Sequence, residues 1–388
     1  MKPKPHILPT IIFSQFACTT VWFAGNAVVD ELGAKAGFGN EIIGYILSSV
    51  QLGFIIGTLV FALLMIADRF SPSRVFMFSA FLAAFCNLAV LFTGDSKLLL
   101  LTARFGTGFF LAGIYPVGMK IAADYFESGL GKALGLLVGA LVLGKSFPYF
   151  IKGAEFGRDY EIVILAASAM AVFGGILLWI LVKDGPYRRP SIKLRLEAGP
   201  ALFRISGFRK AAIGYFGHMW ELYAFWGFLA YALYVFNEGQ VEKVSVPVWT
   251  FIIIALGGIS CILGGYFSLR FGSLRVARTA LALSGLCCLL SPLFFELAPA
   301  GFLFCFSIWG MAVTADSPQF SSLVANSVVP ELKGTGLTMV NSIGFAISIV
   351  SIELLSALID KIDGQLLFLV LVPGPLLGLW QLFRRKLH

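Results

Sequence analysis

The chain has 388 residues, of which 58% are hydrophobic and only 13% charged, and its mean hydropathy is +0.88. This composition leaves too little polar surface for a water-soluble globule and predicts a protein embedded in a bilayer. The net charge of +8 comes from loops between apolar stretches, which indicates contact with anionic lipid headgroups and argues against nucleic acid as a partner.

Twelve stretches are apolar and long enough to cross a membrane as helices, because a helical span needs about 20 residues. The sequence therefore predicts an all-α membrane protein with twelve transmembrane helices. The predicted spans cover roughly residues 7–29, 41–66, 74–93, 98–123, 131–151, 161–183, 211–236, 247–269, 276–295, 300–325, 335–358 and 366–383.

The first apolar stretch follows a short basic segment, residues 1–6, and continues past Val21 without a cleavage site of small residues. It is therefore predicted to be a membrane span and not a removed signal peptide. With the N-terminus inside, 20 of the 29 Lys and Arg residues fall in inner segments, six in outer loops and three within spans. The positive-inside rule then places both termini in the cytoplasm, and a bacterial inner membrane is the expected location.

Two features recur at a nearly constant spacing along the chain. Arg69 lies in a loop between the second and third spans, and Arg270 lies in a similar loop 201 positions later. Pro116 in the fourth span parallels Pro318 in the tenth, 202 positions later. These matches predict an internal duplication, an architecture common among transporters. The expected parts are an N-terminal six-helix half, a basic cytoplasmic linker and a C-terminal six-helix half, at residues 1–183, 184–210 and 211–388.

The segment from Lys183 to Lys210 carries eight Lys and Arg residues and three prolines. Leucines and a phenylalanine within residues 194–205 could form a short helix in the membrane interface, with the cations at headgroup level. An ordinary solvated linker is the alternative.

Glycines recur at helical spacing in several spans, as with Gly53 and Gly57 in the second span and Gly131 and Gly135 in the fifth. Small residues let helix backbones approach closely. The pattern fits either static packing or a sliding surface between moving halves.

No metal site or cofactor is expected. All six cysteines fall inside predicted spans without metal-ligand spacing to a histidine, so free thiols are expected. His218 and Glu221 have such spacing, but the other two histidines of the chain are close to its ends. The sequence also has no nucleotide-binding loop and no nucleophile-and-base motif, so an enzyme is not expected.

Residues 104–108, followed by Gly113 and Pro116, together with the loop around Asp68 and Arg69, resemble the sequence motifs of the major facilitator superfamily. The resemblance covers essentially the whole chain. It implies two pseudo-symmetric six-helix halves that work as a secondary transporter by alternating access.

A narrower resemblance links residues 115–120, 220–223 and 315–320 to permeases grouped with nitrate and cyanate transporters. The chain also departs from the superfamily pattern, because Leu64 and Ser71 stand where the loop motif has glycines. The fifth span lacks the Gly-Pro pair typical of the family's drug antiporters, which lowers the expectation of multidrug export.

Polar residues within the predicted spans gather in the four spans that, by resemblance, line a central cavity. Ionisable groups inside a membrane are costly, so their presence indicates function or pairing. These residues are Gln15 and Asn26 in the first span, Arg104 and Lys120 in the fourth, His218 and Glu221 in the seventh, and Asp316 and Gln319 in the tenth.

Arg104 presents a planar five-donor fork that suits carboxylate and oxyanion groups, and it matches the family's arginine of the fourth span. We expect it to hold the substrate together with Asn26, His218 and Gln319. Aromatic residues of the seventh span, including Trp220 and Tyr223, could enclose a ligand or stack over a cation, although most of them are expected to be packing residues.

Glu221 lies near the middle of the seventh span, about 15 Å from its start in a core about 30 Å thick, and His218 precedes it by three residues on the same face. We predict Glu221 and Asp316 as a proton-coupling pair, because two carboxylates in one dry cavity could take up and release protons. The alternative is that each carboxylate neutralises an embedded cation or accepts hydrogen bonds from Tyr223 or Trp220.

Lys120 is four residues before Asp124, a spacing that predicts an ion pair on one helix face. By resemblance, Asp124 docks against the loop of Asp68 and Arg69 as part of an inner gate. Lys145 lies near the outer end of the fifth span, where its ammonium could reach water or contact a ligand.

The embedded cations belong to the N-terminal half and the carboxylates to the C-terminal half. The sequence thus predicts a proton-coupled symporter of a small organic or inorganic anion, acting as a monomer among membrane lipids. One alternative is a proton-coupled exporter of organic cations or amphipathic drugs. Another is a membrane receptor that binds ligand without transporting it.

Overall fold

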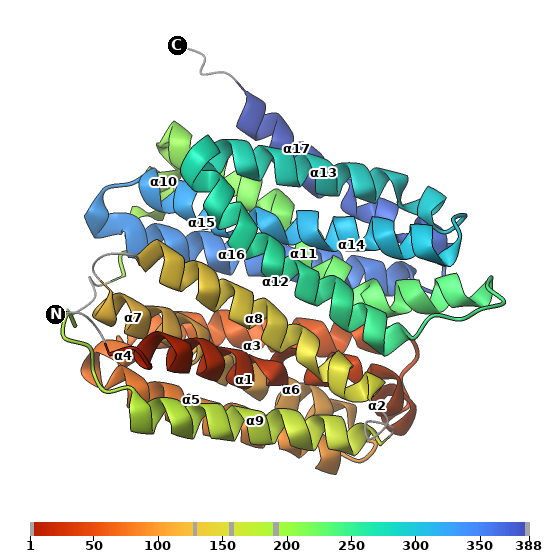
Figure 1. Ribbon diagram of the computed structural model, residues 1–388, viewed down its shortest axis with the longest axis horizontal. Helices are drawn as coiled ribbons and strands as arrows, with labels where there is room; N and C mark the ends of the chain where they lie inside the picture. The colour runs from red at the N-terminus through yellow and green to blue at the C-terminus, as the bar shows by residue number, and fades with distance from the viewer. Residues whose placement is uncertain (1–3, 127–129, 155–158, 189–193, 385–388) are drawn as a thin grey trace. The chain divides into compact units, whose positions relative to one another are not determined.

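The computed structural model describes residues 4–126, 130–154, 159–188 and 194–384, which form helices and no strand. In this part of the chain, twelve helical segments are long and apolar enough to cross a membrane (Figure 1). Those in the first half are α1 Ile7–Ala27, α3 Ile42–Leu63, α5 Pro72–Ala89 with η1 Val90–Phe92, α6 Lys97–Leu111 with α7 Tyr115–Tyr125, α8 Leu130–Gly153 and α9 Tyr160–Leu181. Those in the second half are α11 Ser206–Glu238, α12 Val246–Phe271, α13 Ser273–Phe294, α14 Pro299–Ala315 with α15 Ser317–Asn326, η4 Pro330–Leu332 with α16 Lys333–Leu358, and η5 Gly364–Leu371 with α17 Pro373–Phe383. The shorter elements are α2 Val29–Ala36, α4 Ile66–Arg69, η3 Leu196–Ala198 and α10 Gly199–Arg204.

The prediction of an all-α protein with twelve spans is confirmed. The largest differences in the position of a boundary are of five residues: α11 begins at Ser206, before the predicted start at 211, and the eleventh span begins at Pro330, before the predicted start at 335. In the first turn of α11, Phe208 is buried and Arg209 is exposed, so this turn already has an apolar face to pack. Polar residues on the opposite face lower the mean hydropathy of this turn, so it was not included in the predicted apolar span.

The fourth and tenth spans are each broken near the proline that marks the repeat. Pro116 is the second residue of α7, and Pro318 is the second residue of α15. A proline has no N–H to donate and its ring crowds the preceding turn, so a continuous helix is interrupted there. At the second break, the backbone carbonyl of Thr314 accepts a hydrogen bond from Cys261 Sγ at 3.1 Å.

The helices cluster into two compact units. Unit 1 comprises residues 1–193 and 245–251, and unit 2 comprises residues 194–244 and 252–388. Within unit 1, α1 packs against α8 and α9, and α5 packs against α6 and α9 (Figure 1). Within unit 2, α11 packs against α16 and α17, and α13 packs against α14.

Part of the predicted basic linker is helical. Residues 189–193 of it lie outside the described residues, and the remainder includes η3 and the six-residue helix α10. Leu202 of α10 is buried, and the backbone N–H of Arg195 donates to Thr335 Oγ1 at 3.1 Å. This segment therefore packs against α16 within unit 2.

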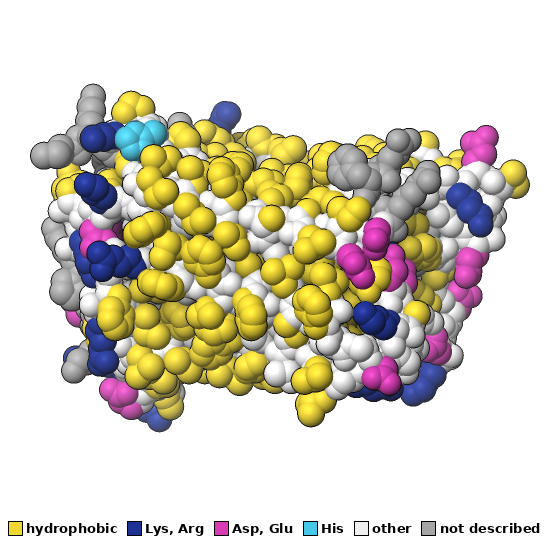
Figure 2. Space-filling view, turned by 90° about the horizontal axis from the view of Figure 1, so that it is seen from below, with side chains coloured by type: hydrophobic (Ala, Val, Ile, Leu, Met, Phe, Trp, Pro, Cys, Tyr) yellow, Lys and Arg dark blue, Asp and Glu magenta, His cyan; other side chains and the backbone are white. Residues whose placement is uncertain are grey.

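Hydrophobic side chains cover the middle of the face on which α5, α6 and α9 lie, and charged side chains gather at its two ends (Figure 2). The exposed apolar residues include Phe78 and Phe85 of α5 and Phe173 of α9, which are 55 to 69% exposed. An apolar band of this kind between polar ends suits a surface that faces lipid.

The glycines differ in what surrounds them. A Cβ atom added to Gly53 or Gly57 of α3 would clash with the carbonyl oxygens of Phe105 and Phe109 of α6. At Gly131 and Gly135 of α8, an added Cβ would meet no atom of the described residues within 4 Å. Close static packing therefore explains the glycines of α3 but not these two of α8.

Gly53→Ala is expected to lower the thermal stability, because α3 and α6 must separate to admit the methyl group. Overpacking of this kind costs about 1 to 3 kcal/mol. The melting temperature of the purified protein measures the effect, and Gly131→Ala is the matched control, expected to be neutral or slightly stabilising because alanine favours helix. Equal melting temperatures for Gly53→Ala and wild type would contradict the close approach of α3 and α6.

Candidate functional site

Arg104 of α6 is fully buried in unit 1 and bonded to oxygen atoms of two other helices. Its Nη1 donates to Asn87 Oδ1 of α5 at 2.9 Å and to the carbonyl of Val21 at 3.3 Å. Its Nη2 donates to the carbonyls of Trp22 at 2.6 Å and Val21 at 3.4 Å. Both terminal nitrogens of the predicted anion-binding fork are thus bonded to protein oxygens, and the guanidinium joins α6 to α1 and α5.

Two neighbours make room for this guanidinium and orient its partner. A Cβ atom on Gly25 would stand 2.8 Å from Arg104 Nε, so a glycine is needed at that point of α1. Asn87 Nδ2 donates to Ser168 Oγ of α9 at 2.9 Å, which leaves its carbonyl oxygen directed at Arg104. Asn87 was missed from the sequence, where the one available signal is an amide within an otherwise apolar run.

One face of α1 presents Gln15, Trp22 and Asn26, which are seven and four residues apart and so share a side of the helix. Gln15 and Asn26 are buried, and their side-chain amides have no hydrogen-bond partner in the described part of the chain. Lys145 of α8 is 1% exposed, and its Nζ lies 3.8 Å from the centroid of the Trp22 ring. This cluster offers amide donors and an ammonium in a buried setting.

A second cluster lies in unit 2, where the break in the tenth span meets α11. His218 Nδ1 is 2.8 Å from Asp316 Oδ1, and both side chains are fully buried. The imidazole lies beside the rings of Tyr215 and Phe320, each with its centroid 5.8 Å away, and those two rings are 6.4 Å from each other. Asp316 is the residue that separates α14 from α15, so the helix break delivers its carboxyl to His218.

The second cluster also contains polar atoms without a hydrogen bond. Asp316 Oδ2, His218 Nε2 and Gln319 Nε2 are buried, and none of them bonds to a described residue. Buried donors and acceptors are normally paired, so unpaired ones in a membrane protein are candidates for contact with a substrate, water or proton.

Glu221 of α11 has partners other than those proposed from the sequence. Its Oε1 accepts from Trp309 Nε1 of α14 at 2.6 Å, and its Oε2 accepts from Ser284 Oγ of α13 at 2.9 Å. The alternative in which Trp220 donates to Glu221 is wrong, because the Trp220 N–H has another acceptor. Glu221 is three residues from His218, and this turn of the helix directs the two side chains at different neighbours.

Trp220 and Tyr223 pack elsewhere in unit 2. Trp220 Nε1 donates to the carbonyl of Val370 at 3.3 Å, and the Tyr223 ring lies 5.1 Å from that of Phe345 and 5.4 Å from that of Trp226. Trp220 thus faces η5 while Tyr223 faces α16.

Glu221→Gln is expected to leave the melting temperature close to wild type. The amide oxygen can accept from Trp309, and the amide nitrogen can donate to Ser284, whose hydroxyl also donates to the carbonyl of Leu281. Glu221→Ala should be less stable by about 1 to 3 kcal/mol, because the buried Trp309 N–H loses its acceptor. Thermal unfolding of the two variants side by side measures the difference, and equal losses would show that the charge, and not the hydrogen bonds, matters.

The predicted gate residues meet through a lysine in unit 1. Lys120 Nζ lies 3.0 Å from Asp68 Oδ1 and 3.9 Å from Asp124 Oδ1. Arg69 is exposed and forms no ion pair with a carboxylate among the residues described. Arg188 donates to the carbonyls of Asp68 and Phe70, so the loop is held from both sides.

The structure thus brings Lys120 to Asp68 and Asp124, and His218 to Asp316, while it gives Arg104 and Glu221 separate sets of partners. Sequence reasoning missed Asn87, Ser284 and Trp309 because neutral polar and aromatic residues are ordinary in membrane spans. Within the described ranges, no group of three or more His, Cys, Asp or Glu side chains is placed to hold a metal ion.

A model of the Major Facilitator Superfamily matches residues 8–383. Solved structures with a similar fold include the nucleoside transporter NupG, with a TM-score of 0.75 and 14% identity over 97% of this chain and 100% of that one. The human organic anion transporter TETRAN has a TM-score of 0.72 and 16% identity, over 98% of this chain and 100% of that one. A bacterial homologue of the human lysosomal transporter Spinster, solved in an inward-facing and occupied conformation, has a TM-score of 0.69 and 15% identity, over 98% of this chain and 94% of that one. A search of curated protein sequences finds no match. The narrower resemblance to nitrate and cyanate permeases stays a prediction.

Proposed function

Since the chain belongs to the Major Facilitator Superfamily, it is a multi-pass membrane transporter, and we propose that it carries a small organic or inorganic anion together with protons. The buried polar side chains of units 1 and 2 support this proposal. Unit 1 contributes cations and amide donors, and unit 2 contributes the carboxyl groups.

The observation that carries the anion proposal is the cluster of Lys145 with the Gln15, Trp22 and Asn26 face of α1. An ammonium above an aromatic ring, with unpaired amides on the same helix face, provides a charge and donors for an anion. The backbone N–H and C=O groups of a helix already bond to each other within the membrane, so the side chains on its face are the groups that can bind a ligand.

Arg104 adds a second buried positive charge behind this face. It forms no ion pair with a carboxylate in the described part of unit 1, so its charge is balanced only by carbonyl and amide oxygens. We propose that Arg104 attracts the anion through this charge and fixes the backbone of Val21 and Trp22, whose ring meets Lys145. Direct contact between Arg104 and the substrate would require its fork to leave these oxygens.

We assign proton coupling to the carboxyl groups of unit 2, Asp316 and Glu221. Asp316 is the better placed of the two, because one of its oxygens has no described hydrogen-bond partner and the other lies 2.8 Å from His218 Nδ1. His218 and Gln319 are proposed to contact the substrate or the proton path, with Trp220 and Tyr223 as packing neighbours.

The remaining parts of the proposal concern gating and location. Asp68, Lys120 and Asp124 form the network that would hold an inner gate closed, with Arg69 at its exposed edge. A bacterial inner membrane, cytoplasmic termini, symport and a monomeric state complete the proposed function.

A thermal-stability screen tests the anion proposal, because a ligand that binds the folded state raises its stability. Purified wild type, Lys145→Met and Lys152→Met are compared against matched panels of small anions and organic cations. Lys152 is the control on the same helix, since its Nζ lies 3.0 Å from Glu31 near the surface. An anion that stabilises wild type and Lys152→Met but not Lys145→Met would support the proposal.

The opposite pattern identifies the alternative. Stabilisation by an organic cation that survives in Lys145→Met and is lost in Asp316→Asn would overturn the anion proposal in favour of cation export. Ligand binding without any flux into proteoliposomes would indicate a receptor.

A further inference from the structure

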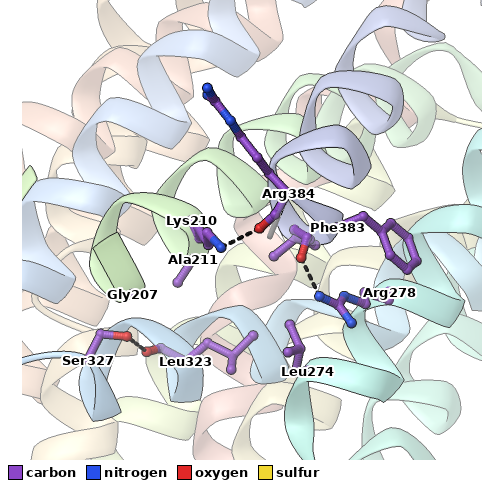
Figure 3. A pocket seen from close by; sticks show the side chains of 10 residues that line it. Gly207, Lys210, Ala211, Leu274, Arg278, Leu323, Ser327, Phe383 and Arg384 are labelled. Carbon is purple, nitrogen blue, oxygen red and sulfur yellow. Dashed lines mark hydrogen bonds between the residues drawn. The ribbon is translucent and has the colours of Figure 1, made fainter. Parts of the chain in front are cut away.

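A cavity of about 470 Å³ lies at one end of unit 2, where α11 and α13 begin and α15 and α17 end (Figure 3). The side chains of Lys210 and Arg278 line it, and none of the described lining residues is acidic. We call this cavity the basic pocket. It is separate from both clusters described above.

Most donors of Lys210 and Arg278 remain available, and Arg384 is a third basic residue of the lining. Lys210 Nζ donates to the carbonyl of Arg384 and Arg278 Nη2 donates to the carbonyl of Leu382, as the dashed lines in Figure 3 show. An ammonium has three donors and a guanidinium has five, so one bond each leaves several unused. Arg278 Nε is buried and has no hydrogen-bond partner among the described residues. An acceptor bound in the pocket could therefore take a hydrogen bond from this N–H group.

Two helix N-termini add to the positive potential. Gly207 and Leu274 line the pocket and are the second residues of α11 and α13, which are 33 and 22 residues long. Neither helix has a side-chain cap. The first N–H groups of a helix are not bonded within it and carry a partial positive charge, so they favour an anion. The carbonyls at the end of α17 are already bonded to Lys210 and Arg278.

The other walls of the pocket are apolar and continue onto an exposed apolar surface. Leu323 and Leu382 line it, and the Phe383 ring lies 4.5 Å from the Arg278 guanidinium. Phe383 and Trp380 of α17 are 60 and 62% exposed. A tryptophan beside cations is typical of the boundary between acyl chains and headgroups. The positive-inside rule places this end in the cytoplasm, where the leaflet carries anionic lipids.

We propose that the basic pocket binds the phosphate group of an anionic phospholipid from the cytoplasmic leaflet. The phosphate accepts from Lys210, Arg278 and the helix N-termini, and the acyl chains leave along α17 past Phe383. A soluble phosphate would share the polar contacts but would not use the apolar exit.

The repeat supplies an internal comparison. A cavity of about 590 Å³ lies in unit 1 between the start of α5 and the end of α9, lined by Trp179 and Lys183. These residues precede Trp380 and Arg384 by 201 positions, the spacing of the duplication. That cavity also contains Asp184, which accepts from Ser71 and pairs with Arg188. An acidic wall repels a phosphate, so the proposal applies to unit 2 only.

Native mass spectrometry and thermal unfolding of the full chain in detergent test the proposal. The probes are dioctanoyl phosphatidylglycerol, dioctanoyl phosphatidylcholine and inorganic phosphate. The test variant is Lys210→Gln with Arg278→Gln, and the control is Arg209→Gln with Arg275→Gln. The control removes two charges from the same ends of α11 and α13 at exposed positions outside the pocket.

Phosphatidylglycerol should bind wild type and the control more tightly than phosphatidylcholine does. Its affinity for the test variant should fall about 30-fold, at about fivefold for each cation lost near a membrane surface. If the double variant does not purify in folded form, Lys210→Gln alone should lose about fivefold.

Equal affinity losses in the test variant and the control would overturn the proposal, because they would indicate general attraction to charge. Stabilisation by inorganic phosphate that equals or exceeds that by phosphatidylglycerol would also overturn it and assign the pocket to a soluble anion. Failure of wild type to prefer phosphatidylglycerol over phosphatidylcholine would do the same.

Discussion

Arg104→Ala should lower the stability of the protein by about 2 to 4 kcal/mol and remove the anion response. The side chain makes four hydrogen bonds to α1 and α5, and interhelical bonds in membranes contribute about 0.6 kcal/mol each. The cavity left by a buried side chain adds to this loss. Thermal unfolding in detergent, with and without an anion from the panel, measures both effects.

Two further variants separate the charge of Arg104 from its geometry. Arg104→Lys keeps the charge but cannot span the same three oxygen partners, so an intermediate melting temperature is expected. Arg275→Ala removes an exposed arginine and should have little effect. If Arg104→Ala melts at the wild-type temperature, the guanidinium does not hold α1, α5 and α6 together.

Asp316→Asn is expected to abolish accumulation of the transported anion under an imposed proton gradient. Asparagine has nearly the same shape, so it keeps the contact with His218, but it cannot take up or release a proton. Exchange of internal for external anion, which needs no net proton movement, should persist. Flux of a labelled anion into proteoliposomes, with and without the gradient, measures the two processes.

Glu221→Gln is the comparison for this experiment, because both oxygens of Glu221 already accept hydrogen bonds from Trp309 and Ser284. It should retain at least part of the gradient-driven uptake. Loss of coupling in Glu221→Gln with normal coupling in Asp316→Asn would reverse the assignment of the proton site.

The spans could be predicted from sequence because hydropathy over about 20 residues reports directly on burial in lipid. The sequence showed Pro116 and Pro318 only as a repeated feature, and the structure adds that each lies at a helix break, since the missing N–H of a proline acts locally. The start of α11 could not be found in this way, because its first turn is apolar on one face only.

Side-chain partners were harder to predict, because they depend on the rotation of each helix about its axis. His218 and Glu221 look like neighbours by spacing, yet one contacts Asp316 of the tenth span and the other contacts Ser284 of α13. The guanidinium of Arg104 was predicted to be available to a ligand, but it donates to the backbone carbonyls of Val21 and Trp22. Every residue has a backbone carbonyl, so the sequence does not indicate which ones accept these bonds.

The two contacts of Trp22 use different parts of the same residue: its ring lies under Lys145, and its carbonyl accepts from Arg104. Every amino acid has the carbonyl, whereas only an aromatic residue has the ring. If the anion binds as proposed, mutation at this position would change ligand preference and leave the backbone carbonyl that anchors α1 in place. Under this proposal, substrate preference could change at position 22 without loss of the hydrogen bonds that hold α1.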